Sequence, residues 1–491
     1  MNLNFISKKL SFTQDLLITL MNVFSVILST IFINAIISRK YGLDFVGEFN
    51  LVKRVALSAA PFILFGASIV IPKLFGEIPE KNYRSFFRQL MLYFLILPLP
   101  LLFIFFLLIP AEKGGIHSFY IPENLKLIFA LVLAADLVFQ LFYSIFRGIR
   151  QFIPAALLSF SVNALIPLIF FLLFGFATFH QVYLMIGIFM LATALFFPLL
   201  MLQKQFSPQA PAPISLLKPL LSQSAQRAPG MFFQFLLISA PILIISRYGS
   251  PAELTYVTVG ITISRLLLSI VTPIGFVFLP RIAAQREAGS LSDVSQKLIQ
   301  ISQFFLLLLA LMIPWLLINS PWLLNLWIRL TDTDGIRLIH LFIFAIPGIV
   351  FYEMVRIPID ALYDRGLNSV ILFAGTLSFF ITVYFMRHTY AAAVAAAFGA
   401  AYLVMTFISL IALSHRKIYL FKGENFSHLF SALLLFLGAI YFMHRYDFHL
   451  ITENALYFIM TALLLLYLWK FTKLEFILLI KSKLRLTGNR Q

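Results

Sequence analysis

The chain is dominated by apolar stretches long enough to cross a lipid bilayer, and these constrain its fold more than any motif. A transmembrane helix needs about 20 mostly apolar residues. Hydrophobic residues make up 61% of the 491, whereas soluble domains contain about 45–50%. The stretches of spanning length lie near 13–37, 48–71, 87–110, 125–146, 152–174, 181–202, 224–246, 254–279, 298–319, 338–361, 367–386, 390–413, 428–443 and 453–469. We therefore predict an all-α integral membrane protein with about 14 transmembrane helices.

A short run of residues occurs twice, about 208 positions apart. Residues 36–42 read IISRKYG and residues 244–249 read IISRYG, and each copy ends one apolar stretch and opens the next. The same landmarks follow both times: a basic residue, a proline, a glycine and then a second proline beside a basic residue. Two halves related in this way are typical of transporters, although apolar composition alone makes chance matches easier.

The repeat predicts the domain organisation. An N-terminal lobe would comprise spans 1–6 in residues 1–205, and a C-terminal lobe spans 7–12 in residues 223–415. Between them lies a linker at 206–222, in a proline-rich segment that suits a semi-rigid spacer. Residues 416–491 would form a terminal helix pair and a basic tail.

The distribution of charge predicts the orientation. The chain has 37 Lys and Arg against 20 Asp and Glu. Most of the basic residues outside the spans fall in segments that lie inside if the N-terminus is cytoplasmic, so the positive-inside rule places both termini in the cytoplasm. The same bias accounts for much of the net charge of +17 through topology and contact with anionic lipids. No nucleic-acid partner is needed to explain it.

Sequence signs of enzymatic chemistry are scarce. There is no nucleotide-binding glycine motif and no cysteine, and the eight histidines show no metal-ligand spacing. The Asp332-Thr333-Asp334 sequence beside Gly335 is interpreted as a polar turn rather than a metal-nucleotide site. The outer loops are too short to carry a catalytic domain. We therefore expect no enzyme activity, no cofactor and no metal.

The ionisable residues inside the spans are the candidate functional groups. A charge in hydrocarbon costs about 2.5–3.5 kcal/mol on insertion scales and usually faces a wet cavity or a partner. The candidates for binding an anion such as pyrophosphate are Lys53, Arg54, Arg227, Arg265 and Arg356. The candidates for coupling to an ion are Asp136, Glu353 and Asp360.

Their surroundings in the sequence differ. Arg54 and Arg265 occupy matching positions in the two repeats without an acidic neighbour on their own spans, which predicts two cations facing a central cavity. Arg favours phosphate through its fork of donors. Glu353 and Arg356 either neutralise each other or face the cavity. Snorkelling to the membrane surface is the alternative for Lys53 and Arg227, and polar packing against another helix is the alternative for Asp136.

The run from Tyr41 to Arg54 resembles the polysaccharide-biosynthesis flippases (Wzx type) of the multidrug/oligosaccharidyl-lipid/polysaccharide exporter superfamily. The segment from Ser264 through Gly275 to Pro280 is similar to the corresponding span of the lipid II flippases in that superfamily. The resemblance implies a V-shaped fold of two six-helix lobes and a terminal pair, working by alternating access. It also implies that Arg54, with Lys53, and Arg265 contact a pyrophosphate. Span 1 departs from the lipid II flippases because nothing basic lies between Lys9 and Arg39.

The resemblance implies transport of an undecaprenyl-pyrophosphate-linked oligosaccharide across the bacterial inner membrane, as an O-antigen, capsule or exopolysaccharide unit. The partners would be the lipid-linked oligosaccharide, bilayer lipids and a polysaccharide polymerase with its chain-length machinery. A multidrug or cation antiporter of the same fold is the alternative, for which an acidic cavity is expected. A membrane glycosyltransferase or polymerase is disfavoured by the short loops.

Overall fold

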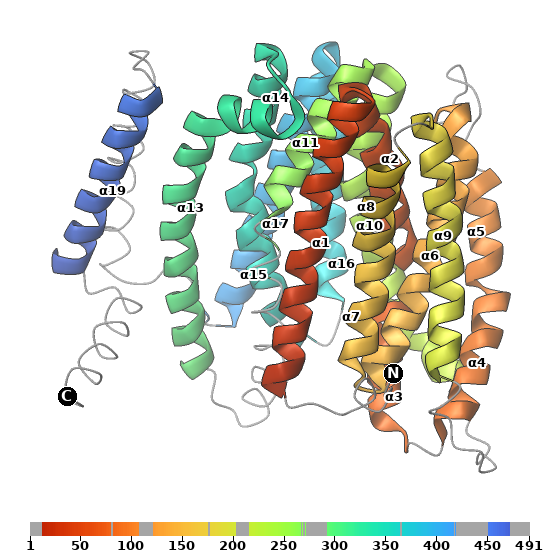
Figure 1. Ribbon diagram of the computed structural model, residues 1–491. Coiled ribbons are helices and arrows are strands. Elements are labelled where there is room, and N and C mark those ends of the chain that lie inside the picture. The colour runs from red at the N-terminus through yellow and green to blue at the C-terminus, as the bar shows by residue number, and fades with distance from the viewer. Residues whose placement is uncertain are drawn as a thin grey trace, which may run out of the picture.

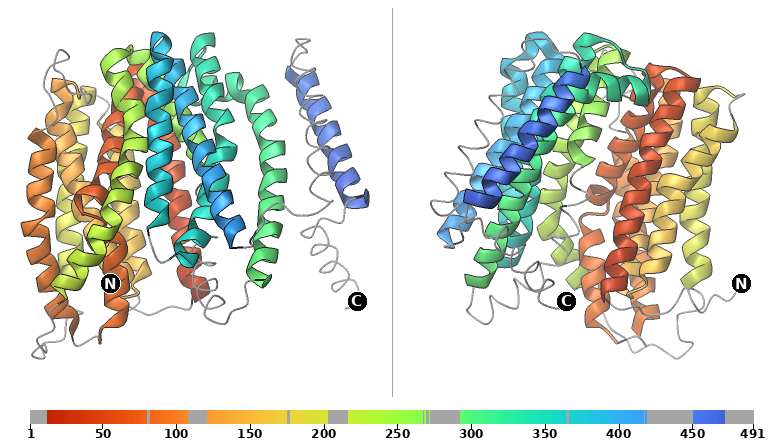
Figure 2. Two further views of the ribbon diagram at one scale, coloured as in Figure 1. Left: turned by 180° about the vertical axis from the view of Figure 1, so that it is seen from behind. Right: turned by 60° about the vertical axis from the view of Figure 1, so that its left-hand side comes forward.

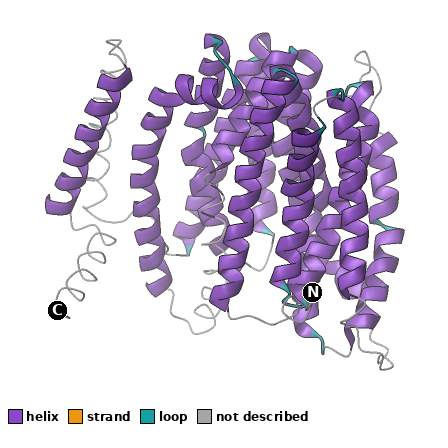
Figure 3. Ribbon diagram, viewed as in Figure 1, coloured by secondary structure: helices purple, strands orange, loops and turns teal. Residues whose placement is uncertain are grey.

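The computed structural model describes residues 12–79, 82–107, 121–174, 177–202, 216–266, 268, 271, 292–363, 366–416, 418 and 450–471. All regular secondary structure in these segments is helical (Figure 3). The first half contains α1 (Phe12–Lys40), α2 (Leu43–Ile63), α3 (Ala67–Glu77), α4 (Tyr83–Ile96), α5 (Pro98–Leu107), α6 (Glu123–Gly148), α7 (Phe152–Phe160), the π-helix η3 (Ser161–Leu165), α8 (Ile166–Leu173) and α9 (Phe179–Leu202). The second half contains α10 (Leu217–Tyr248), α11 (Pro251–Leu266), α13 (Ser292–Ile328), α14 (Thr333–Phe344), α15 (Ile346–Leu362), α16 (Leu367–Phe385), the 3-10 turn η4 (Arg387–Thr389), α17 (Tyr390–His415) and α19 (Leu450–Phe471).

The predicted all-α membrane fold is confirmed. Ten described helices are long and apolar enough to cross a membrane, or eleven if the bent pair α2 and α3 is one span. α11 covers the first part of the predicted eighth span, and α19 coincides with the predicted fourteenth. The predicted thirteenth span, 428–443, lies outside the described residues. α10 begins at Leu217, so the last residues of the predicted linker are helical.

The helices form two groups that meet along α2 and α11 (Figure 1). α6 packs against α2, α3, α7 and α9 in the first group, and α17 packs against α14, α15 and α16 in the second. In the right-hand view of Figure 2 the two groups meet at the top and diverge toward the bottom. α1 also contacts α13 through two hydrogen bonds. Arg39 Nη2 donates to the carbonyl oxygen of Leu326 at 2.8 Å, and Trp327 Nε1 donates to the carbonyl oxygen of Ile31 at 2.7 Å.

The landmarks shared by the repeats have a structural basis in the first copy. α2 carries Pro61 in its last turn, and the chain then turns through Phe65 and Gly66, both at positive φ (52° and 78°). The helix axis bends by 56° between α2 and α3. A side chain at Gly66 would also lie 3.1 Å from Cβ of Arg227 on α10. Glycine therefore meets two requirements here, the backbone conformation and the close approach of α10.

Residues one repeat apart touch where α2 crosses α11. Arg54 donates a hydrogen bond to Thr262 Oγ1, and these residues are separated by 208 positions. A Cβ added at Gly47 would lie 2.6 Å from Oγ1 of Thr255, at the same separation in the sequence. Contacts of this kind are what a two-fold arrangement of duplicated halves predicts.

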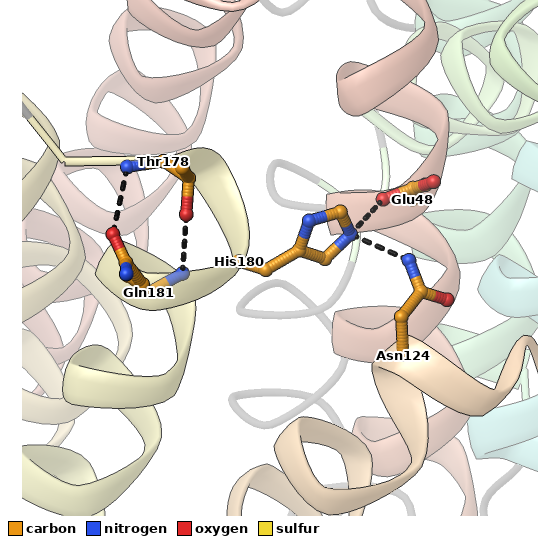
Figure 4. A network of polar contacts seen from close by, with 5 residues as sticks. All are labelled: Glu48, Asn124, Thr178, His180 and Gln181. Carbon is orange, nitrogen blue, oxygen red and sulfur yellow. Dashed lines mark hydrogen bonds and ion pairs between the residues drawn. The ribbon is translucent and has the colours of Figure 1, made fainter.

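A cluster of polar side chains joins three helices of the first group. At the start of α9, Thr178 and Gln181 form a reciprocal capping box, and the neighbouring His180 reaches across to α2 and α6 (Figure 4). His180 Nε2 lies 3.0 Å from Glu48 Oε2 and 2.8 Å from Asn124 Nδ2. The sequence analysis did not single out this contact, because its members come from three separate spans.

α19 docks on α13 through polar pairs. Asn319 and Asn454 exchange amide hydrogen bonds at 2.9 and 3.0 Å, and Tyr457 donates to the carbonyl oxygen of Leu311. Interhelical amide pairs are effective in lipid because the unpaired groups have no water to bond instead. α19 is thereby attached to the second group of helices.

The close contact between α2 and α11 predicts the effect of a substitution at Gly47. Gly47→Ala should destabilise the protein by about 1–3 kcal/mol, because the new methyl group overpacks the contact with Thr255, whose backbone is also close. Gly399→Ala in α17 is the matched control, since its nearest neighbour would lie at an ordinary 3.6 Å. Alanine is the better helix former, so this control should be neutral or stabilising. Thermal unfolding in detergent measures both, and equal melting temperatures would contradict the tight crossing.

Candidate functional site

Two adjoining cavities lie where the groups meet. The larger has a volume of 410 Å³ and is lined by α1, α2, α6, α7, η3 and α11, and the smaller, of 280 Å³, is lined by α2, α10 and α11. Both are bordered by Arg54, Leu57 and Arg265. We refer to the two together as the central cavity.

Three cations face this cavity. Lys53 Nζ donates to Thr30 Oγ1 at 3.0 Å and lies 5.5 Å from the centre of the Phe49 ring. Arg54 donates to Thr262, while its Nε has no hydrogen-bond partner among the described residues. Arg265 makes no hydrogen bond or ion pair with any residue in the described part of the chain and lies close enough to Arg54 for the two charges to interact. Lys53 therefore faces the cavity and does not snorkel.

No carboxylate lines either part of the central cavity in the described segments. Unpaired cations in a membrane interior are strongly unfavourable unless water or an anion compensates them. Arginine presents a planar fork of donors that matches phosphate, and both Arg54 and Arg265 line the two parts of the cavity. This arrangement is suited to binding a phosphorylated group.

Arg54 and Arg265, which were predicted to match in the two repeats, lie on helices that touch. Arg54 donates a hydrogen bond to Thr262, three residues before Arg265 on α11. Both arginines line the cavity. Their equivalence in the repeat stays a prediction.

The remaining basic candidates are not brought to the cavity. Arg227 is exposed on α10, packs beside Gly66 and lines neither part of it. Arg356 forms an ion pair with Glu353 at 3.6 Å, which is the neutralising alternative considered for this pair. Its Nη2 also donates to Gln234 Oε1 at 3.4 Å, and Gln234 lines the smaller cavity. The side chain of Asp360 lies outside the described part of the structure.

Asp136 is the one carboxylate candidate with a connection to the cavity cations. It is 1% exposed on α6, and neither of its oxygens accepts a hydrogen bond from a described residue. The sequence showed no basic residue near it on its own span, but the fold brings Lys53 of α2 within electrostatic range. The two alternatives considered for Asp136, ion coupling and polar packing against another helix, stay predictions.

The Asp332 sequence is a helix cap. Asp332 precedes α14 and accepts a hydrogen bond from the backbone nitrogen of Gly335 at 2.9 Å. This bond, helped by the Tyr256 hydroxyl, holds the pKa of the Asp332 carboxyl below its usual value. The interpretation as a polar turn is confirmed.

Comparison with known proteins identifies the fold. No family model and no curated protein matches the chain. A solved structure of the lipid II flippase MurJ in an inward closed conformation superposes with a TM-score of 0.67 at 14% identity, covering 92% of this chain and 99% of that one. A eukaryotic MATE transporter gives a TM-score of 0.52 at 12% identity, covering 82% and 95%. A Vibrio cholerae MATE transporter gives 0.51 at 14%, covering 84% and 97%. The chain shares the fold of these transporters.

The cavity geometry predicts the outcome of arginine substitutions. Arg54→Ala and Arg265→Ala should each weaken the binding of geranyl pyrophosphate about tenfold to hundredfold, because each loses charged hydrogen bonds worth about 1.5–3 kcal/mol. Arg265→Lys should recover part of the loss, since charge returns without the fork. Titration of the purified protein in lipid nanodiscs measures the affinity. Arg337→Ala, at an exposed position on α14, is the control; unchanged affinity in both cavity variants would exclude the anion site.

Proposed function

We propose that the protein is a flippase that moves an undecaprenyl-pyrophosphate-linked oligosaccharide from the inner to the outer leaflet. The substrate would be a repeat unit of an O-antigen, capsule or exopolysaccharide. The observation that carries the proposal is the set of Lys53, Arg54 and Arg265 around a cavity without a described carboxylate. A pyrophosphate would supply the negative charge that balances these three cations. The fold shared with a lipid II flippase and the resemblance of residues 41–54 to Wzx-type flippases support the same substrate class.

The cellular setting belongs to the same proposal. The protein would lie in the bacterial inner membrane with both termini in the cytoplasm, and it would deliver its product to a polysaccharide polymerase. The upper ends of the helices in Figure 1, where α1 ends and α14 begins, would then face the outside. The contacts of α1 with α13 join the two groups of helices at that end.

A cation exporter of the same fold is less well supported. Such a protein needs acidic groups that reach its substrate. The described lining carries three cations, and Glu353 is already paired with Arg356. A cationic drug would therefore be repelled from the central cavity.

Genetic complementation tests the proposed function. Expression in a strain that lacks its own O-unit flippase should restore surface glycan when the matching repeat unit is made. Arg54→Ala and Arg265→Ala should abolish this restoration at unchanged protein abundance, and Arg337→Ala should not. Full restoration by both cavity variants would contradict a role for the cationic cavity in transport.

The energy source is proposed to act through Asp136 and Lys53. A negative Asp136 attracts the Lys53 ammonium, whereas a protonated or cation-bound Asp136 releases it to the substrate, so ion binding and anion binding would be linked. Asp136→Asn should then remove the dependence of flipping on pH or membrane potential and bind geranyl pyrophosphate at least as tightly as the wild type, because Lys53 is released to the anion. Flipping is measured in proteoliposomes with an imposed gradient.

A double-substitution cycle tests the pairing. If Asp136 acts through Lys53, Asp136→Asn combined with Lys53→Met should lose no more gradient dependence than either change alone. Glu123→Gln, at the exposed start of α6, controls for loss of a carboxylate. Normal transport with normal gradient dependence in Asp136→Asn would remove Asp136 from the mechanism.

A further inference from the structure

The larger cavity has a second wall whose chemistry differs from that of the cations. Besides the cations of α2 and α11, it is lined by Asn22 on α1, Ser159 on α7 and Asn163 in η3. We call these three residues the amide wall. They are neutral, and each offers groups that can both donate and accept hydrogen bonds.

Hydrogen bonding within the amide wall is incomplete. Asn22 Nδ2 donates to Ser159 Oγ at 3.1 Å, and Asn163 Nδ2 donates to the Ser159 carbonyl oxygen at 3.3 Å. Asn22 is only 9% exposed, and its Oδ1 is covered yet accepts from no described residue. Buried amides are normally satisfied. A turn of the Asn22 amide about χ2 would bring this unsatisfied oxygen toward the cavity that the residue lines.

The backbone is irregular at the same place. The span that starts with α7 is interrupted by η3, and Asn163 is the middle residue of this π-helical turn. π-Helical turns are rare and occur often at functional sites, because the extra residue redirects the side chains of that turn. Here the turn contributes Asn163 to the lining of the cavity.

Two aromatic rings from α6 also line the larger cavity. Phe139 and Tyr143 both line it, with ring centroids 5.4 Å apart and planes inclined by 35°. Neutral amides and hydroxyls beside an aromatic face suit a sugar, whose hydroxyls exchange hydrogen bonds while its C–H face packs on a ring. A second phosphate would require cations, and a prenyl chain would leave the amides unsatisfied.

We propose that the amide wall and Tyr143 form the subsite for a neutral pyranose joined directly to the pyrophosphate that Arg54 and Arg265 hold. This inference rests on the proposed function and adds the chemical class of the first sugar. The cavity volume of 410 Å³ lies in the range of small-molecule sites, about 300–1,000 Å³. The subsite and the cations belong to one cavity, so one headgroup would contact both.

The test compares ligands with and without a sugar on the full-length protein in nanodiscs. The probes are geranyl pyrophosphate and its conjugates with glucose, galactose, N-acetylglucosamine and fucose. We expect at least one conjugate to bind about tenfold more tightly than the sugar-free probe. Asn22→Leu and Asn163→Leu should each reduce this advantage about five- to tenfold, the effect of losing one hydrogen bond, and leave the affinity for geranyl pyrophosphate unchanged.

Asn325→Leu is the matched control, because the same chemical change then falls at an exposed position on α13 outside the cavity. Asn22→Ala and Asn163→Ala replace the leucine variants if those fail to fold. Equal affinity for all conjugates and the sugar-free probe overturns the subsite but retains the anion site. Parallel loss of both affinities in the asparagine variants also overturns it, since the wall would then only support the cations. Failure of the wild-type protein to bind geranyl pyrophosphate overturns the proposed function and the subsite together.

Discussion

The crossing of α2 and α11 is the contact on which the rest of the site depends. At this point residues one repeat apart meet, Gly47 against Thr255 and Arg54 against Thr262. Only a residue without a Cβ lets the two backbones come so close at Gly47. Because the helices touch here, the cavity begins directly beside the crossing, and Arg265 reaches the same space as Arg54. A wider crossing would move the two arginines apart, so that the positive potential would be split between two weaker anion sites.

The cavity is positively charged because the fold brings basic side chains to its lining and keeps the nearby carboxylates out of it. Glu353 is paired with Arg356, and Asp136, which interacts with Lys53, is not part of the cavity lining. In the proposed mechanism, Asp136 acts on Lys53 from within the protein and the ligand acts on it from the cavity. Competition of this kind would tie the charge state of the buried acid to the occupancy of an anion site.

The helical fold was predictable from the sequence, because hydropathy alone identifies the spans. Lys53, Arg54 and Arg265 were named from their places on those spans, and the structure brings all three to one cavity. Contacts between distant spans were not predictable, because a place near a span end does not say which face Lys53 or Arg227 presents. The hydrogen bond of Arg54 to Thr262 and the π-turn at Asn163 depend on how the helices pack, which local composition does not encode.

The two halves of the chain contribute different chemistry to the cavity. Arg54 bonds to a threonine of α11, and the amide wall lines the cavity from the N-terminal half. A symmetric pocket would offer the same groups to both ends of a ligand. The proposed substrate, a lipid-linked glycan, has a charged phosphate end and a neutral sugar end, so it would gain from a site whose two sides differ. Divergence of single residues between the predicted halves would then be what orients this asymmetric headgroup.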